Sequence, residues 1–209
     1  MKNWNKVFID HSNHKFIEKI RNHYYSIVLK YTNSTMVILD VGCGRGDFLK
    51  VLKGNGYNNL YGIDPEPSFS DDPKEFNFKK GTSLNIPFKD NCFDCIYIFC
   101  VLHHLKGGKE YNKTILEVRR CLKSDGLFII IEPTNKLLYY FINIFSKLLS
   151  PFSKAAHNLC IIYKYEWGDI IKFLNSWKLI EKQLMAYGFE VISNNKLFHR
   201  RTTILRLKK

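Results

Sequence analysis

Apolar residues occur along this chain in two alternating patterns. Residues 37–41, 59–63 and 93–99 are short, largely apolar runs, which are typical of strands buried on both faces of a parallel sheet. Residues 48–52 and 111–122 instead place apolar side chains at helical spacing. Strands that alternate with helices predict an α/β domain with a doubly wound sheet and helices on both of its faces.

Four further segments complete the predicted sheet. Residues 76–80 alternate like a strand, and residues 127–131 form the most hydrophobic strand of the chain. The last strands are expected at 188–192 and 202–207, and the short loop between them makes the final strand antiparallel to its neighbour. The sequence therefore predicts a seven-stranded, mostly parallel sheet with an antiparallel last strand.

A glycine-rich turn separates the first strand from the first helix of the sheet. Gly42, Gly44 and Gly46 follow the strand with the spacing G-x-G-x-G, and the second strand ends in Asp64 about 20 residues later. Glycines let the backbone approach a ligand closely, and an acid at the second position can bind ribose hydroxyls. An ordinary strand-to-helix connection is the alternative interpretation.

The turn differs from those that bind phosphate groups. A dinucleotide site has the spacing G-x-G-x-x-G, and a nucleoside triphosphate site has Lys-Ser/Thr after its last glycine; neither pattern is present here. Asp40 precedes the turn and Asp47 follows it. The turn therefore favours a ligand with a cationic end over a pyrophosphate.

Five motifs follow one another in a fixed order over about residues 36–133. They are Leu39-Asp40-Val41-Gly42-Cys43-Gly44-Arg45-Gly46, Gly62-Ile63-Asp64, Ile86-Pro87-Phe88 with Phe93-Asp94, Val101-Leu102-His103-His104-Leu105, and Leu122-Lys123-Ser124-Asp125-Gly126-Leu127. Together they resemble the class I S-adenosylmethionine-dependent methyltransferases, in particular the small enzymes of the ubiquinone and biotin pathways. The resemblance implies a Rossmann-like fold, S-adenosylmethionine as the cofactor, and methyl transfer as the reaction.

The resemblance also implies roles for individual residues. The glycine turn would approach the methionine part of the cofactor, Asp40 would steady the turn or face the ammonium group, and Asp64 would bind both ribose hydroxyls. Thr82 stands where the family usually has an aspartate for the adenine amino group, so backbone groups nearby are expected to contribute. The expected cofactor-binding residues are Asp40, Gly42, Cys43, Gly44, Gly46, Asp64, Pro65, Thr82, Ser83, Leu84, Phe99 and Cys100.

His103 is the candidate catalytic residue, because imidazole titrates near neutral pH. Alternatively, it only shapes the pocket. Methyl transfer chiefly requires an acceptor held within about 3 to 3.5 Å of the methyl group, and a base is needed only if the acceptor must lose its proton early. We predict no metal: the C-x-x-C of Cys92 and Cys95 has no second pair or His-x-x-x-His, and these cysteines are expected to be free buried thiols.

The length of 209 residues indicates one domain. Its expected parts are a helical leader (1–35), a cofactor-binding core (36–133), a helical lid or acceptor-binding insertion after the fifth strand (134–176), and a closing helix at 178–187 with the last strands (177–209). No run reaches the ~18 to 20 apolar residues of a membrane span, and residues 1–6 lack the apolar stretch of a signal peptide. We expect a cytoplasmic protein.

The insertion is the most informative region for the acceptor. Residues 137–149 form a predicted helix with a narrow polar stripe and a wide apolar face, which either packs over the sheet or, if exposed, lies on an anionic membrane. No Asn/Asp-Pro-Pro-Tyr/Phe loop follows the fourth strand, which disfavours amino-methylation of a nucleic-acid base. We predict a small-molecule or lipid-linked acceptor, methylated on oxygen or carbon.

The formal charge of +13 is unevenly distributed. Residues 1–132 hold 19 Lys and Arg against 15 Asp and Glu, whereas residues 133–209 hold 13 against 4. Unless it reflects codon usage alone, this positive field favours an anionic partner. RNA methylation, supported by Arg200 and Arg201, is therefore an alternative function, although no RNA-binding module is recognisable. A second alternative is a cofactor-binding partner of another methyltransferase, without catalysis of its own.

Overall fold

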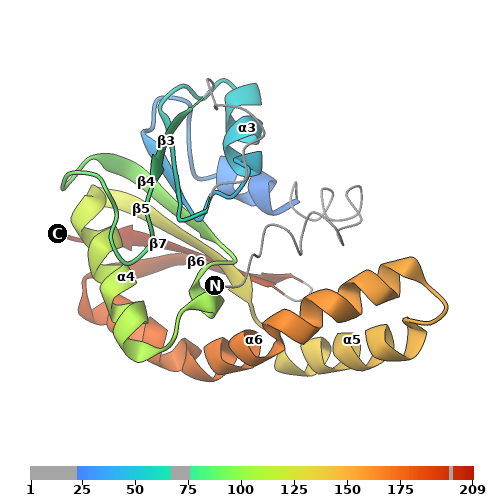
Figure 1. The fold of residues 1–209 in the computed structure, drawn as a ribbon. Helices are drawn as coiled ribbons and strands as arrows, with labels where there is room; N and C mark the ends of the chain where they lie inside the picture. The colour runs from blue at the N-terminus through green and yellow to red at the C-terminus, as the bar shows by residue number, and fades with distance from the viewer. Residues whose placement is uncertain (1–22, 67–75, 198–199) are drawn as a thin grey trace.

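A computed structural model describes residues 23–66, 76–197 and 200–209 (Figure 1). Seven strands form one sheet in the order β3-β2-β1-β4-β5-β7-β6. The strands are β1 (Ile38–Val41), β2 (Leu60–Asp64), β3 (Asn77–Lys80), β4 (Phe93–Phe99), β5 (Leu122–Pro133), β6 (Phe189–Leu197) and β7 (Arg200–Leu207). The first five strands run parallel, and β7 is antiparallel to both β5 and β6. The predicted fold class is confirmed.

Helices cover both faces of the sheet, as Figure 1 shows. They are α3 (Asp47–Gly54), the short 3-10 helix η1 (Leu102–His104), α4 (Gly108–Cys121), α5 (Lys136–Leu149) and α6 (Lys154–Ala186). Residues 23–29 are also helical; they belong to the predicted leader, whose residues 1–22 lie outside the described part of the chain.

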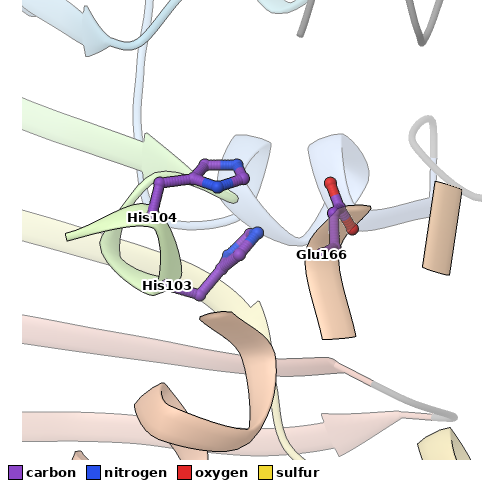
Figure 2. Close-up of side chains that lie close together, drawn as sticks. All are labelled: His103, His104 and Glu166. Carbon is purple, nitrogen blue, oxygen red and sulfur yellow. The ribbon is translucent and has the colours of Figure 1, made fainter. Parts of the chain in front are cut away.

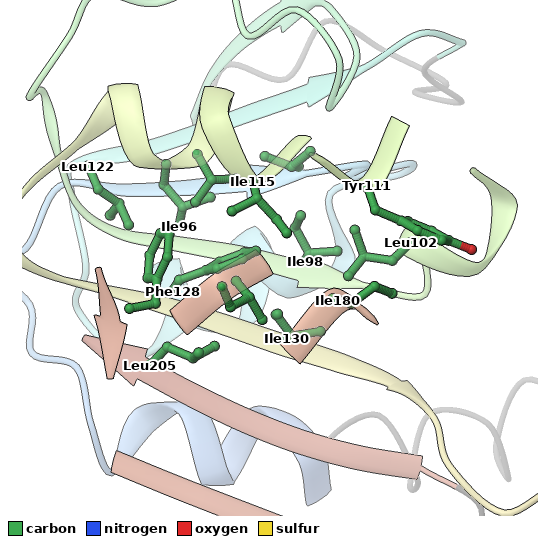
Figure 3. Close-up of a cluster of buried hydrophobic side chains, with 14 of the residues drawn as sticks. Ile96, Ile98, Leu102, Tyr111, Ile115, Leu122, Phe128, Ile130, Ile180 and Leu205 are labelled. Atoms are coloured by element: carbon green, nitrogen blue, oxygen red, sulfur yellow. The ribbon is translucent and has the colours of Figure 1, made fainter. Parts of the chain in front are cut away.

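Alternate residues of the central strand point into two separate cores. Ile96 and Ile98 of β4 join the core between the sheet and helices α4 and α6, which Figure 3 shows. Cys95 and Tyr97 join the core on the opposite face, beneath α3 and residues 24–28. Both faces of a central strand must therefore be apolar, which is why β4 and β5 are nearly continuous hydrophobic runs in the sequence.

Two helices differ from their predicted form. α6 runs unbroken from Lys154, so the helix expected at 178–187 is only its last part. Ile170, Phe173, Trp177, Ile180 and Leu184 are buried at a spacing of three and four residues, which carries the helix through the polar pair at 175 and 176. α4 begins at Gly108, before the expected start at 111; Ile115 and Val118 occupy its face toward the sheet, and Leu116 is 40% exposed.

Two polar side chains of α4 hold the loop that contains the Ile-Pro-Phe motif. Arg120 donates from Nη1 to the carbonyl of Phe88 (2.8 Å) and from Nη2 to that of Ile86 (3.0 Å). Glu117 accepts from the N–H of Ile86 (2.8 Å) and pairs with Arg120. These contacts fix the loop that leads from the end of β3 to the start of β4 against the last turn of α4.

The strand expected at 127–131 begins earlier, at Leu122. Residues 123–126 form an irregular start of β5, in which Asp125 has a φ of 58°. The pairing with β4 shifts between Phe93 and Cys95, where it resumes opposite Leu127. A bulge of this kind bends the strand but keeps it in the sheet.

Candidate active site

The glycine turn lies between β1 and α3, at the carboxyl end of the central strands. Gly42, Gly44 and Gly46 all have positive φ angles (78°, 52° and 70°), a conformation that glycine adopts without strain. A Cβ atom on Gly42 would lie 2.3 Å from Cγ2 of Val101, whereas one on Gly44 would meet no protein atom within 4 Å. The first glycine is therefore required by packing, and the second borders open space in which a ligand can lie.

Asp64 ends β2 and is held against this turn. Its Oδ2 accepts from the N–H of Gly44 (3.0 Å), and its Oδ1 accepts from the N–H of Glu66 (2.8 Å). Each carboxylate oxygen has a second lone pair, so both remain able to accept a hydrogen bond from a ribose hydroxyl. Pro65, the next residue, is exposed at the rim.

Carboxylates dominate the charge around the turn. Asp40 is buried, and burial raises the pKa of its carboxyl, with further increases from Asp64 and Asp47. Arg45 neutralises Asp47 across a distance of 3.1 Å. A cationic group in this site would offset the remaining negative charge, and a pyrophosphate would add to it. The turn therefore fits a ligand such as S-adenosylmethionine, which carries an ammonium and a sulfonium.

Several other expected cofactor residues direct their side chains away from this space. Cys43 is buried against Gly62, on which an added Cβ would lie 2.8 Å from its Sγ. Ser83 is buried, and its hydroxyl accepts from Oγ1 of Thr114 (3.1 Å), while Thr82 is exposed and Leu84 packs on the core. A ligand in this space could therefore contact only the backbone atoms of Cys43 and Ser83.

The end of β4 makes a sharp bend toward η1. Cys100 has a φ of 59° and donates its N–H to the carbonyl of Ile131 (3.0 Å), and burial raises the pKa of its thiol to about 12. Arg200 contacts the sulfur of Cys100 and lies over the ring of Phe99, 5.0 Å from its centroid. Arg200 thereby joins the candidate site from β7, a contribution that the sequence alone did not indicate.

Glu132, at the end of β5, is the principal site residue that sequence reasoning missed. Its Oε1 accepts from the N–H groups of Val101 (2.8 Å) and Leu102 (2.6 Å), and its Oε2 lies 2.7 Å from Nδ1 of His103. Both side chains are buried. Within the described residues, Nε2 of His103 has no hydrogen-bond partner. An acid at the end of the most hydrophobic strand was the available signal.

His103 has further ionisable neighbours, shown in Figure 2. The ring of His104 lies 4.0 Å from that of His103, and one donor atom from each of these histidines and from Glu166 lie within 4.8 Å of one another. Asp169 approaches His104 to 4.0 Å. Two imidazoles and a carboxylate can also hold a divalent transition metal, and the expectation of no metal concerned the cysteines alone.

The acidic residues here outnumber the fixed cations. Burial lowers the pKa of His103, but the charge and the hydrogen bond of Glu132 outweigh it and raise the pKa above its ordinary value. Burial raises the pKa of Glu166, although His103 and Arg200 lower it. The cluster therefore favours a cation, and His103 supplies one when it is protonated.

Comparisons with known proteins agree with this geometry. The methyltransferase domain family matches residues 39–130. The demethylmenaquinone methyltransferase of Lactobacillus johnsonii is 29% identical over 174 residues, covering 76% of this chain and 70% of that protein.

Solved structures resemble the whole chain. The PH0226 protein of Pyrococcus horikoshii has a TM-score of 0.66 at 17% identity, and all of both chains is covered. A chain in the complex between the Haloferax volcanii Trm112 methyltransferase activator and a candidate methyltransferase has a TM-score of 0.64 at 13% identity, covering 98% of this chain and 93% of that one. At these identities the likeness concerns the fold. Fold, glycine turn and sequence matches together identify the chain as a class I S-adenosylmethionine-dependent methyltransferase.

Proposed function

We propose that the protein methylates an oxygen or carbon atom of a small-molecule or lipid-linked acceptor. The observation that carries this proposal is the buried Nε2 of His103 on η1, just after β4, the strand that pairs with β1 beside the acid-rich glycine turn. Because carboxyl ends of parallel strands meet at one edge of the sheet, the two features face a common space. S-adenosylmethionine supplies an electrophilic methyl group there.

The residues divide the task of holding the cofactor. The glycine turn and Asp40 would bind the methionine end with its ammonium, and Asp64 would bind the ribose hydroxyls. Backbone groups around Ser83 and Leu84 would contact the adenine, since Thr82 carries no charge. Phe99 and Cys100 would line the methionine arm.

His103 would act as the acid–base residue toward the acceptor. Glu132 accepts a hydrogen bond from the Nδ1–H of His103, which leaves the lone pair of Nε2 available to take a proton from a hydroxyl or an acidic carbon. The negative charge of Glu132 also makes the imidazole more basic. If His103 only shapes the pocket, a His103→Ala variant will retain turnover.

RNA methylation receives less support than a small acceptor. The two arginines that favoured it are engaged within the protein: Arg201 lies 4.3 Å from the ring centroid of Trp177 and 3.5 Å from Glu181, and Arg200 lies over Phe99. A non-catalytic role receives less support because cofactor binding alone would not require the buried pair of His103 and Glu132.

Labelled S-adenosylmethionine and a host extract provide the test. After incubation, the label is partitioned among lipids, small molecules, RNA and protein, with His103→Ala as the comparison. Label in the lipid or small-molecule fraction supports the proposal. Label in RNA supports the first alternative, and cofactor binding without any transfer supports the second.

A further inference from the structure

α5 turns its apolar side away from the protein. Its buried positions are Tyr139 and Ser146. Seven large apolar side chains, each between 42% and 65% exposed, form what we call the arm face: Leu137, Tyr140, Phe141, Ile144, Phe145, Leu148 and Leu149. Phe152, just after the helix, is 87% exposed. A helix of a water-soluble domain normally has the opposite arrangement, and a continuous apolar surface of this kind marks an interaction site.

The arm face is not needed to hold the arm together. α5 and the first half of α6 form a hairpin that extends away from the sheet (Figure 1). Inside the hairpin, Tyr139 packs against Tyr163 with ring centroids 5.7 Å apart, and Ile170 completes the cluster. Of the arm face, Tyr140 also contacts Trp167 of α6, with ring centroids 6.3 Å apart, whereas the other exposed side chains lie on the far side of α5 and are available to a partner.

The charge around the arm face identifies this partner. Residues 133–165 contain no aspartate or glutamate, and their four lysines, at 136, 147, 154 and 164, are exposed. A second copy of this chain would bring the same positive charge and be repelled. RNA would match the lysines but not seven exposed apolar side chains. Anionic lipids match both, because lysines attract their headgroups while aromatic and leucine side chains enter the acyl boundary.

We propose that the arm face docks on the surface of an anionic lipid bilayer. Among the described residues, no helix is long and apolar enough to cross a membrane, so α5 lies along the surface. The docking itself goes beyond the proposed function, because it concerns where the enzyme works and does not depend on methyl transfer.

The base of the arm adjoins the candidate active site. α5 begins four residues after Glu132, and Tyr163 of the arm cluster stands one helical turn before Glu166 of the site. An acceptor anchored in the bilayer would therefore present its head group near His103. This assignment of a lipid-linked acceptor rests on the proposed function.

Vesicle flotation tests the docking. The purified full chain is mixed with vesicles of phosphatidylcholine containing about one third phosphatidylglycerol, or of phosphatidylcholine alone, and only the anionic vesicles should carry it upward. Phe145→Ser with Leu148→Ser, both at exposed positions, should lower the partition coefficient at least about tenfold. Lys147→Gln, which removes one positive charge, should lower it about fivefold. The matched control, Leu116→Ser with Met185→Ser, changes exposed apolar residues outside the arm and should float like the wild type.

Several results would overturn the docking proposal. They are a wild type that stays at the bottom with anionic vesicles, equal flotation on neutral vesicles, or arm variants that float like the wild type. A dimer in light scattering that the Phe145/Leu148 variant dissociates would assign the arm face to a second copy instead. Calorimetric binding of S-adenosylmethionine is measured in parallel: a protein that floats but binds no cofactor refutes the proposed function and leaves docking intact.

Discussion

A glutamine in place of Glu132 tests whether this carboxylate sets the protonation of His103. In the wild type the Nδ1–H of His103 donates to Oε2 across 2.7 Å, which leaves Nε2 free to accept a proton. The amide oxygen of glutamine can still accept from the N–H groups of Val101 and Leu102. Its NH2 group then faces the ring, so Nδ1 becomes an acceptor and the proton moves to Nε2. The Glu132→Gln variant therefore preserves the shape of the side chain at 132 and makes the imidazole of His103 less basic.

The size of the effect follows from the lost charged hydrogen bond. Such a bond contributes about 1.5 to 3 kcal/mol, and one pKa unit corresponds to about 1.36 kcal/mol, so the pKa of His103 should fall by roughly 1 to 2 units. The folded wild type has a pKa above the ordinary 6.5. The pair therefore stabilises the fold fully below about pH 6.5, and this stability is lost as the pH rises through the folded-state pKa.

A titration of the imidazole resonances by nuclear magnetic resonance measures this pKa without knowledge of the acceptor. Wild type and Glu132→Gln are compared with Glu190→Gln, which changes an exposed glutamate on β6 and should leave His103 unaffected. Thermal unfolding verifies that each variant is folded. A wild-type pKa of 6.5 or lower, or the same pKa in wild type and Glu132→Gln, would refute the reasoning.

Three further outcomes are expected. Asp64→Ala should weaken S-adenosylmethionine binding by about 1 to 3 kcal/mol in calorimetry through its lost hydrogen bonds to the ribose, and unchanged affinity would exclude this residue from the site. Gly44→Val should abolish cofactor binding while circular dichroism stays unchanged, because the side chain would fill open space at a φ of 52°; retained binding would contradict this placement. Zinc ions should inhibit turnover by binding the three donors of Figure 2, more strongly as the pH rises and the imidazoles lose their protons, and Glu166→Gln should relieve the inhibition. Inhibition that is independent of both pH and Glu166 would point to another zinc site.

The sheet and the glycine turn were predictable because their signals are local. A strand buried on both faces needs a continuous apolar run, and the three positive φ angles of the turn require glycines at the same positions. The sequence could not show that Cys43 and Ser83 direct their side chains into the protein, since that depends on Gly62 and Thr114.

The orientation of α5 could not be predicted from its own periodicity. An apolar stripe shows that a helix has two faces, but not which one meets the rest of the protein. Here Tyr139 and Ser146 face inward because α6 supplies the matching surface, and α6 is longer than expected. The apolar residues of α6 from Ile170 to Leu184 keep a helical spacing in the sequence. The polar residues at 175 and 176 fall between them and interrupt the apolar run, so the continuity of the helix is easy to miss.

The two halves of the site differ in how the chain assembles them. In the proposed cofactor half, the glycines, Asp40 and Asp64 lie on two adjacent strands and one turn, so a short motif carries most of the information. The proposed acceptor half brings together His103, Glu132, Glu166 and Arg200 from four different elements. No spacing rule links these residues, and each is an ordinary surface type when taken alone. Because acceptors differ between methyltransferases while the cofactor does not, the variable chemistry resides in residues that only the folded sheet brings within reach of one another.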